Sequence, residues 1–300
     1  MVEKRVKEVT VKHFCIANHI IEITFQQSRI NNLQLLPSFS AFLCEKPEGK
    51  PLFKLVVDDN IKPEDNRKLI REFDTGNGDI IVYELSNGGY QFVVKNVFER
   101  ECALLICRNN FQNCYCALNG NEAMRSFGLN DSLMLIFAFA GAYQQTLLIH
   151  ASCIIYNGKA YPFIAKSGTG KSTHSSLWMK HIEGVELLND DNPIIRIIDG
   201  HPFVYGSPWS GKTPCYRNRQ VPLGAIVQIE RSTTNSAERL PVVQAFATLL
   251  PACSSMKWDS VLNDYLCNIL SRILQTTPVY AMHCLPNEEA ARVCHQALTL

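Results

Sequence analysis

The sequence predicts an α/β protein in which a β-rich domain precedes a domain with a mixed sheet. Short apolar runs alternate with turn-forming residues over residues 9–118, which is typical of strands. The pattern then changes to apolar helices alternating with strands, and a strand at residues 160–164 leads into a glycine-rich loop. We therefore expect a β-rich domain over residues 1–122 and an α/β domain over residues 123–300.

The β-rich domain contains three clear strand candidates. They are Ile20–Phe25, Asp79–Tyr83 and Tyr90–Val94. The last two flank Ser86-Asn87-Gly88-Gly89, a connection whose Asn-Gly and Gly-Gly pairs tolerate positive φ. This spacing predicts a hairpin over residues 79–94. No role is predicted for this domain.

The first helix of the second domain is expected at an apolar run. Asn130-Asp131-Ser132 offers a helix cap ahead of the run, which extends from Leu133 to Tyr143. That length is short of the about 20 residues that a membrane-spanning helix requires. A buried helix is therefore expected here.

Two hairpins are predicted in the second domain. Asn157-Gly158 joins residues 151–156 to residues 160–164, and Asp199-Gly200 joins residues 194–198 to residues 202–205. The glycine-rich loop thus follows directly after an antiparallel strand, and the sheet is expected to be mixed. Further along the chain, the pattern predicts strands at 223–230 and 278–283 and helices at 242–250, 258–274 and 287–298.

Charge and composition exclude some partners. The 300 residues include 29 basic and 28 acidic side chains, so the chain has no broad field for nucleic acid or an anionic membrane. The segment Met1–Glu8 is dense in charge where a secretory signal would be apolar, so a cytoplasmic location is expected.

The 12 cysteines are scattered along the chain without a CxxC pair. The densest group, Cys102, Cys107, Cys114 and Cys116, has spacings unlike those of a zinc ribbon. Reduced and mostly buried thiols are expected, with no metal among them.

The segment Ala165–Ser172 follows the pattern of a phosphate-binding loop, except that alanine replaces the opening glycine. Gly168 and Gly170 let the backbone curl so that successive N–H groups point at one anion. Lys171 can reach the β- and γ-phosphates, and the Ser172 hydroxyl can bind magnesium. The dipole of a helix over residues 173–179 then faces the phosphates. The residues predicted to bind the nucleotide are Ser167, Gly168, Thr169, Gly170, Lys171, Ser172 and Thr173.

A pair of carboxylates follows the next predicted strand. Residues 185–189 form a short apolar run that ends in Asp190-Asp191. Such a pair can hold magnesium and accept a proton from a hydroxyl group. The alternative interpretation is a solvated turn.

Residues 206–218 are rich in glycine, proline and polar groups, as an acceptor-binding loop would be. Lys212 and Arg217 are candidates to stabilise the negative charge of a phosphate group. The alternative is a solvated loop in which Trp209 packs on the core.

In their order, His150, the loop Ser167–Ser172 and the pair Asp190-Asp191 resemble the superfamily of HPr kinase/phosphorylase and ATP-dependent phosphoenolpyruvate carboxykinase. The resemblance spans roughly residues 148–230. It implies that Asp190 acts as the base and that Asp191 holds magnesium, although the reverse order is left open. It also implies that His150 lies near the transferred phosphate, the alternative being a histidine satisfied at a strand start.

The resemblance has limits. HPr kinases usually carry glutamate after the phosphate loop, whereas Thr173-His174 follow here, so HPr is not expected to be the acceptor. A phosphoenolpyruvate carboxykinase is typically much longer than this chain.

Together, these observations predict an enzyme, an ATP- and Mg²⁺-dependent kinase, with His150, Lys171, Asp190 and Asp191 as catalytic residues and Ser172 and Asp191 as metal ligands. The expected partners are a nucleotide and a hydroxyl acceptor, either a small molecule or a serine of a peptide or protein. Nucleic acid and membrane are not expected, and a homo-oligomer is left open. The alternatives are a non-catalytic nucleotide-sensing or peptide-binding protein and a phosphorylase or pyrophosphate-using enzyme.

Overall fold

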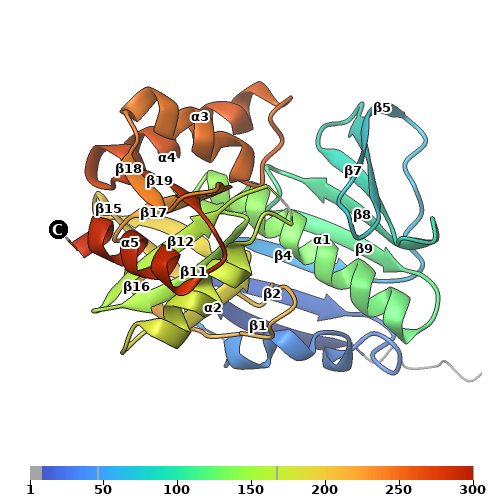
Figure 1. The fold of residues 1–300 in the computed structure, drawn as a ribbon. Coiled ribbons are helices and arrows are strands. Elements are labelled where there is room, and N and C mark those ends of the chain that lie inside the picture. Colours follow the sequence, from blue (N-terminus) through green and yellow to red (C-terminus); the bar gives the residue numbers. More distant parts are fainter. Residues whose placement is uncertain (1–8, 46, 167, 300) are drawn as a thin grey trace, which may run out of the picture. The chain divides into compact units, whose positions relative to one another are not determined.

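The computed structural model describes residues 9–45, 47–166 and 168–299. The charged segment 1–8 and Ser167 of the predicted phosphate loop therefore lie outside the described residues. The chain divides into two compact units, Met1–Gly141 and Ala142–Leu300 (Figure 1). Both combine helix with mixed sheet, as an α/β protein requires. The expected boundary after residue 122 differs from this division, because the helix that begins there lies almost wholly in the first unit.

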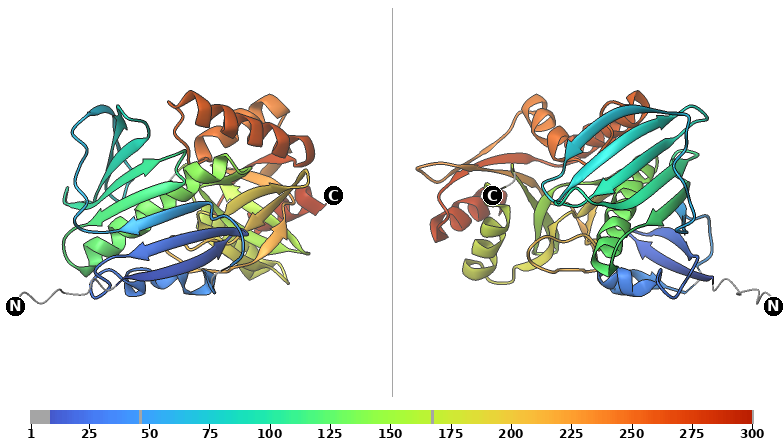
Figure 2. Two further views of the ribbon diagram at one scale, coloured as in Figure 1. Left: turned by 180° about the vertical axis from the view of Figure 1, so that it is seen from behind. Right: turned by 90° about the vertical axis from the view of Figure 1, so that its right-hand side faces the viewer.

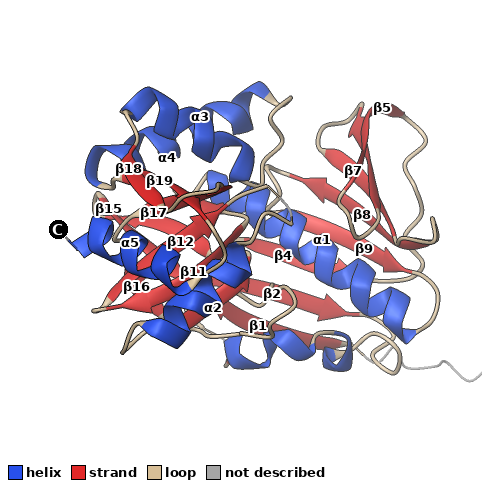
Figure 3. Ribbon diagram, viewed as in Figure 1, coloured by secondary structure: helices blue, strands red, loops and turns tan. Residues whose placement is uncertain are grey.

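The first unit is built on one nine-stranded sheet in the order β3-β1-β2-β4-β9-β8-β7-β6-β5 (Figure 3). Its strands are β1 (Thr10–Ile16), β2 (His19–Phe25), β3 (Leu43–Cys44), β4 (Phe53–Val57), β5 (Arg67–Asp74), β6 (Asp79–Leu85), β7 (Tyr90–Lys95), β8 (Glu101–Arg108) and β9 (Asn113–Leu118). Strand β4 runs parallel to β2 and β9, and the other pairs are antiparallel. The hairpin predicted over residues 79–94 is confirmed as β6–β7.

Helix α1 (Glu122–Ala142) packs on this sheet, where Phe139 stacks on Phe92 of β7. The short 3-10 helix η2 (Pro37–Phe42) contacts Phe14 of β1 through Phe39, and η1 (Leu33–Leu35) is joined to α1 by the hydrogen bond from the Ser126 hydroxyl to the Leu35 carbonyl. The predicted helix start near residue 132 is wrong, because Asn121 caps the helix by accepting a hydrogen bond from the Met124 N–H at 3.0 Å. Inside the helix, the Ser132 hydroxyl donates to the Gly128 carbonyl at 2.7 Å, so it is satisfied without capping. Gly128 also allows a close approach to β8, because an added Cβ would lie 2.7 Å from the Cys102 carbonyl oxygen.

The second unit holds a six-stranded sheet in the order β13-β11-β12-β17-β19-β18 and a four-stranded sheet in the order β10-β14-β15-β16. The strands are β10 (Thr146–Leu148), β11 (Ala151–Tyr156), β12 (Lys159–Ile164), β13 (Glu186–Asp191), β14 (Ile194–Ile198), β15 (His201–Tyr205), β16 (Gln220–Pro222), β17 (Ile226–Arg231), β18 (Ser236–Arg239) and β19 (Val279–Cys284). The helices are α2 (Lys171–His181), α3 (Val242–Ala252), α4 (Ser260–Thr276) and α5 (Glu288–Thr299). Strand β17 runs parallel to β12 and β19, whereas the β11–β12, β11–β13 and β18–β19 pairs are antiparallel, which confirms a mixed sheet.

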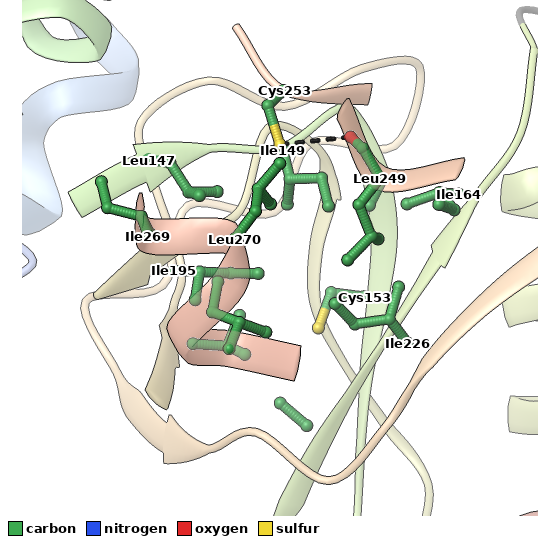
Figure 4. Packing of buried hydrophobic residues seen from close by; sticks show 14 of the residues in the cluster. Leu147, Ile149, Cys153, Ile164, Ile195, Ile226, Leu249, Cys253, Ile269 and Leu270 are labelled. Carbon is green, nitrogen blue, oxygen red and sulfur yellow. Dashed lines mark hydrogen bonds between the residues drawn. The ribbon is translucent and has the colours of Figure 1, made fainter. Parts of the chain in front are cut away.

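Helices cover both faces of the six-stranded sheet. Because successive strand residues point to opposite faces, Cys153 and Ile154 of β11 enter different clusters. Cys153 packs with Leu249 of α3 and Ile269 of α4 in the larger cluster (Figure 4). On the other face, Ile154 packs with the buried Trp178 of α2 and with residues of α5, and these two helices lie side by side (Figure 2). These layers hold β11, β12 and β13 in fixed positions.

Both predicted hairpins of this unit are confirmed. Asn157 and Gly158 have φ values of 46° and 72° in the β11–β12 turn, and Asp199 and Gly200 have φ values of 49° and 84° in the β14–β15 turn. All the cysteines are free thiols, and the densest group of four is buried. Among the described residues, no helix combines the length and apolarity needed to cross a membrane.

Candidate functional site

The glycine-rich loop joins the end of β12 to the first residue of α2. Gly168 and Gly170 adopt φ values of 74° and 127°, which favour glycine. An added Cβ on Gly168 would meet nothing within 4 Å, so the loop borders open space. Gly170 is the N-cap of α2, and no described side chain caps the helix there. The first N–H groups of α2 are therefore oriented as an anion site at a helix N-terminus requires.

Three predicted site residues lie in a hydrogen-bonded row beside this loop. The Lys171 Nζ lies 2.8 Å from His150 Nε2, and His150 Nδ1 lies 3.1 Å from Asp191 Oδ1. Because a lysine ammonium can only donate, Nε2 accepts, so the proton of a neutral imidazole lies on Nδ1 and is donated to Asp191. Asn192 donates to the other carboxylate oxygen of Asp191 at 2.8 Å. The row links the loop to the end of β13.

A β-bulge determines where Asp190 points. Strand β13 pairs Leu187 with Ile154 and Asp190 with Ser152, so Leu188 is the additional residue on its strand. Because opposed residues share a face, Asp190 lies on the face of Ser152, whose hydroxyl is 2.6 Å from that of Ser175 in α2. The bulge thus turns Asp190 toward the side of the sheet that carries α2.

Asp190 is buried and its charge is not compensated by a hydrogen bond. The residue is 4% exposed, and neither carboxylate oxygen has a hydrogen-bond partner among the described residues. It lies close enough to Lys171 to act on its charge: burial lowers the pKa of the Lys171 ammonium, and the charges of Asp191 and Asp190 oppose that shift. A buried carboxylate without partners is costly, so this position calls for a cation or a proton donor.

Asn189 has the opposite environment, which the sequence did not reveal. Its Nδ2 donates to the Ser207 hydroxyl and to the Trp209 carbonyl, each at 3.1 Å. Its Oδ1 accepts from the N–H groups of Asp191 at 3.0 Å and Asn192 at 2.9 Å. Asn189 therefore fixes the backbone that carries the two aspartates.

The predicted acceptor loop runs along β13. The Gly211 N–H donates to the Asp190 carbonyl at 2.8 Å, and the side chain of Arg217 pairs with Glu186 at 2.8 Å. Trp209 is 3% exposed, as the alternative interpretation expected, and Lys212 is exposed. The structure thus places Arg217 on a carboxylate at the start of β13, away from the aspartates at its end.

Sequence reasoning missed Arg231, at the end of β17. Its Nη2 donates to the Gly168 carbonyl at 2.6 Å and its Nε to the Thr169 carbonyl at 3.3 Å. The planar guanidinium therefore braces the loop on the carbonyl side. No spacing signal predicts this contact, because it joins residues 63 positions apart.

The predicted residues fall into two groups. His150, Lys171 and Asp191 are joined directly, and Asp190 lies within electrostatic reach of Lys171. The described nucleotide residues Gly168–Thr173 form the loop and the first turn of α2. Their nucleotide and metal roles stay predictions. Within the described residues, no three His, Cys, Asp or Glu side chains gather as a preformed metal site.

No protein-family model matches the chain, and no curated protein is significantly similar to it in sequence. Among solved structures, the chain is similar to the Hpr(Ser) kinase/phosphatase from Coxiella burnetii. The match has a TM-score of 0.30 and 9% identity, and it covers 50% of this chain and 91% of the other. A TM-score of this size does not establish a shared fold.

Proposed function

We propose that the protein is an ATP- and Mg²⁺-dependent kinase that transfers the terminal phosphoryl group to a hydroxyl, either of a small molecule or of a serine in a peptide or protein. The observation that carries this proposal is the row Lys171–His150–Asp191 beside a glycine-rich loop at the N-terminus of α2. Phosphoryl transfer needs positioning and charge neutralisation more than covalent chemistry, and this arrangement offers both.

The residues present fit magnesium and a triphosphate. Magnesium prefers hard oxygen ligands and usually keeps several waters beside one or two carboxylates, so a preformed cage is not required. Asp191 and the Ser172 hydroxyl are the proposed ligands, and the open cradle at Gly168 suits a phosphate. When bound, the metal supplies charge neutralisation at the phosphate oxygens.

The remaining roles follow from position. Lys171 holds the transferred phosphate, and the hydrogen bond to His150 limits where its ammonium can lie. Asp190, whose carboxylate has no competing hydrogen bond from the described residues, accepts the proton of the attacking hydroxyl. Asn189 accepts a hydrogen bond from the backbone N–H of Asp191 and so fixes the backbone that positions the two carboxylates for their different roles.

The test is transfer of label from γ-labelled ATP, with magnesium and a cell extract as the source of acceptors. We expect transfer by the wild type and its loss in Lys171→Ala and Asp190→Asn, each by about 10²-fold or more. The matched control is Lys159→Ala, an exposed lysine at the other end of β12, which should retain transfer.

Binding of ATP is measured separately by titration calorimetry. If the wild type binds ATP but transfers no label, or if neither substitution alters transfer, the kinase proposal fails. The first result would instead support a nucleotide-sensing protein. A wild type that binds no ATP at all would remove both interpretations.

A further inference from the structure

A pocket of about 400 Å³ opens beside the glycine-rich loop within the second unit. Its walls come from four places: the loop itself, the first turns of α2, the end of β17 and the segment after β19. The lining residues include Thr173 and Leu177 from α2, Ile229 from β17, and Leu285 from the segment after β19. The volume falls within the range of about 300–1,000 Å³ that is usual for small-molecule sites.

The pocket lies on a different side of the loop from the reacting residues. Lys171, His150 and the two aspartates do not line it, whereas Gly168, Thr169 and Gly170 do. Lys171 extends toward His150 instead. A ligand whose phosphates rest on the loop can therefore extend in two directions, toward the hydrogen-bonded row at one end and into the pocket at the other.

The chemistry of the pocket suits a flat, uncharged and largely apolar group. Leu177, Ile229 and Leu285 provide apolar surface, and the lining formed by the described residues contains no carboxylate. His174, which also lines it, stays uncharged near neutrality, because burial lowers its pKa to about 4. Arg231 is fixed by its two hydrogen bonds to the loop carbonyls and presents a planar wall that aromatic rings stack on.

We propose that this pocket binds the nucleoside part of the triphosphate, with Arg231 as its polar wall and as the brace that positions the loop. The proposal rests on the proposed function, because it takes the loop to be the phosphate site. It adds the direction in which the nucleotide lies: base and ribose against α2, β17 and Leu285, and terminal phosphate toward Lys171.

The test compares two ligands that share the phosphates and differ in the nucleoside, namely ATP and inorganic tripolyphosphate, each with magnesium. Ser232→Trp fills the pocket, and Leu285→Asn removes apolar surface at a residue that is 37% exposed, so folding is not at risk. The matched control is Thr233→Trp, at the exposed neighbour that does not line the pocket.

We expect titration calorimetry to show that Ser232→Trp and Leu285→Asn weaken ATP binding at least tenfold and change tripolyphosphate binding less than twofold. Thr233→Trp should bind both ligands as the wild type does. Unchanged ATP binding in Ser232→Trp overturns the pocket proposal and leaves the loop as the phosphate site. Equal weakening of both ligands also overturns it, since the substitutions would then act through the loop. A wild type that binds neither ligand removes the proposed function itself.

Discussion

Asn189 and Asp190 are neighbours on β13 and both are buried, yet their polar atoms have opposite environments. Asn189 is 0% exposed and uses both ends of its amide in hydrogen bonds. Asp190 is 4% exposed and neither of its carboxylate oxygens has a partner in the described part of the chain. Buried polar groups that support a fold are normally satisfied, so the contrast separates a scaffold residue from one whose carboxylate is free to meet a ligand.

The largest effect is expected at Asp190. In Asp190→Asn, transfer of phosphate should fall by about 10²–10⁴-fold, the usual contribution of a general base. The free energy of unfolding should stay the same or increase, because a neutral amide costs less to bury than an unpaired carboxylate. Label transfer and urea unfolding measure the two quantities. A loss of stability above about 1 kcal/mol would show that Asp190 has a structural partner, and the contrast with Asn189 would disappear.

In contrast to Asp190→Asn, Asn189→Ala should reduce stability. We expect a loss of about 2–4 kcal/mol in the free energy of unfolding, because several buried donors and acceptors lose their partner together. The matched variant is Asn192→Ala, which among the described residues removes one side-chain hydrogen bond, to Asp191, and should cost about 1 kcal/mol. Urea unfolding of both variants provides the measurement. Equal losses would mean that Asn189 is not the special scaffold residue of this strand.

His174 lies between Asn189 and Asp190 in this comparison, because its Nε2 can accept its hydrogen bond only while the imidazole is neutral. It is 2% exposed and its Nε2 accepts from the Trp178 indole N–H at 3.2 Å, and burial lowers its pKa from 6.5 to about 4. Since the unfolded chain binds a proton more readily, this group's contribution to stability is present above pH 6.5 and is lost as the pH falls toward 4.

The wild type should therefore lose about 2 kcal/mol more than His174→Gln between pH 7 and pH 4.5, since glutamine keeps an acceptor for Trp178 and does not titrate. Urea unfolding at the two pH values gives the difference. Parallel losses in both proteins would show that other groups cause the acid sensitivity.

The smallest effect is expected at the other end of β13. Glu186 pairs with Arg217 at 2.8 Å and with Arg219 at 3.0 Å, but these side chains are exposed. Glu186→Gln should leave the free energy of unfolding and label transfer unchanged, because surface ion pairs contribute little. A clear loss of transfer would indicate that these contacts hold the 206–218 loop in a position that the reaction needs.

Local signals in the sequence were sufficient where geometry depends on a few adjacent residues. Asn157-Gly158 and Asp199-Gly200 predicted their hairpins because both turns demand positive φ. The predicted start of α1 was wrong because Asn130-Asp131-Ser132 has the composition of a cap. The actual cap, Asn121, precedes a stretch with weaker apolar periodicity.

The grouping of the candidate residues was predictable from the sequence, but their geometry was not. The order of His150, the loop and the aspartates indicated one group, and the structure joins His150, Lys171 and Asp191 by hydrogen bonds, while their roles stay predictions. The bulge at Leu188, which determines the direction of Asp190, has no sequence signal. The brace from Arg231 depends on tertiary packing between segments far apart in sequence.

The two sides of the loop also differ in how the chain must fold to make them. Lys171 and His150 are 21 positions apart and are separated by the β11–β12 hairpin, whereas Arg231 meets Gly168 across 63 positions. Because closing a longer loop costs more conformational entropy, the contacts around Lys171 are expected to form from β11, β12 and α2 before β17 and β19 complete the pocket. On the proposed function, the phosphate site would therefore form before the nucleoside pocket.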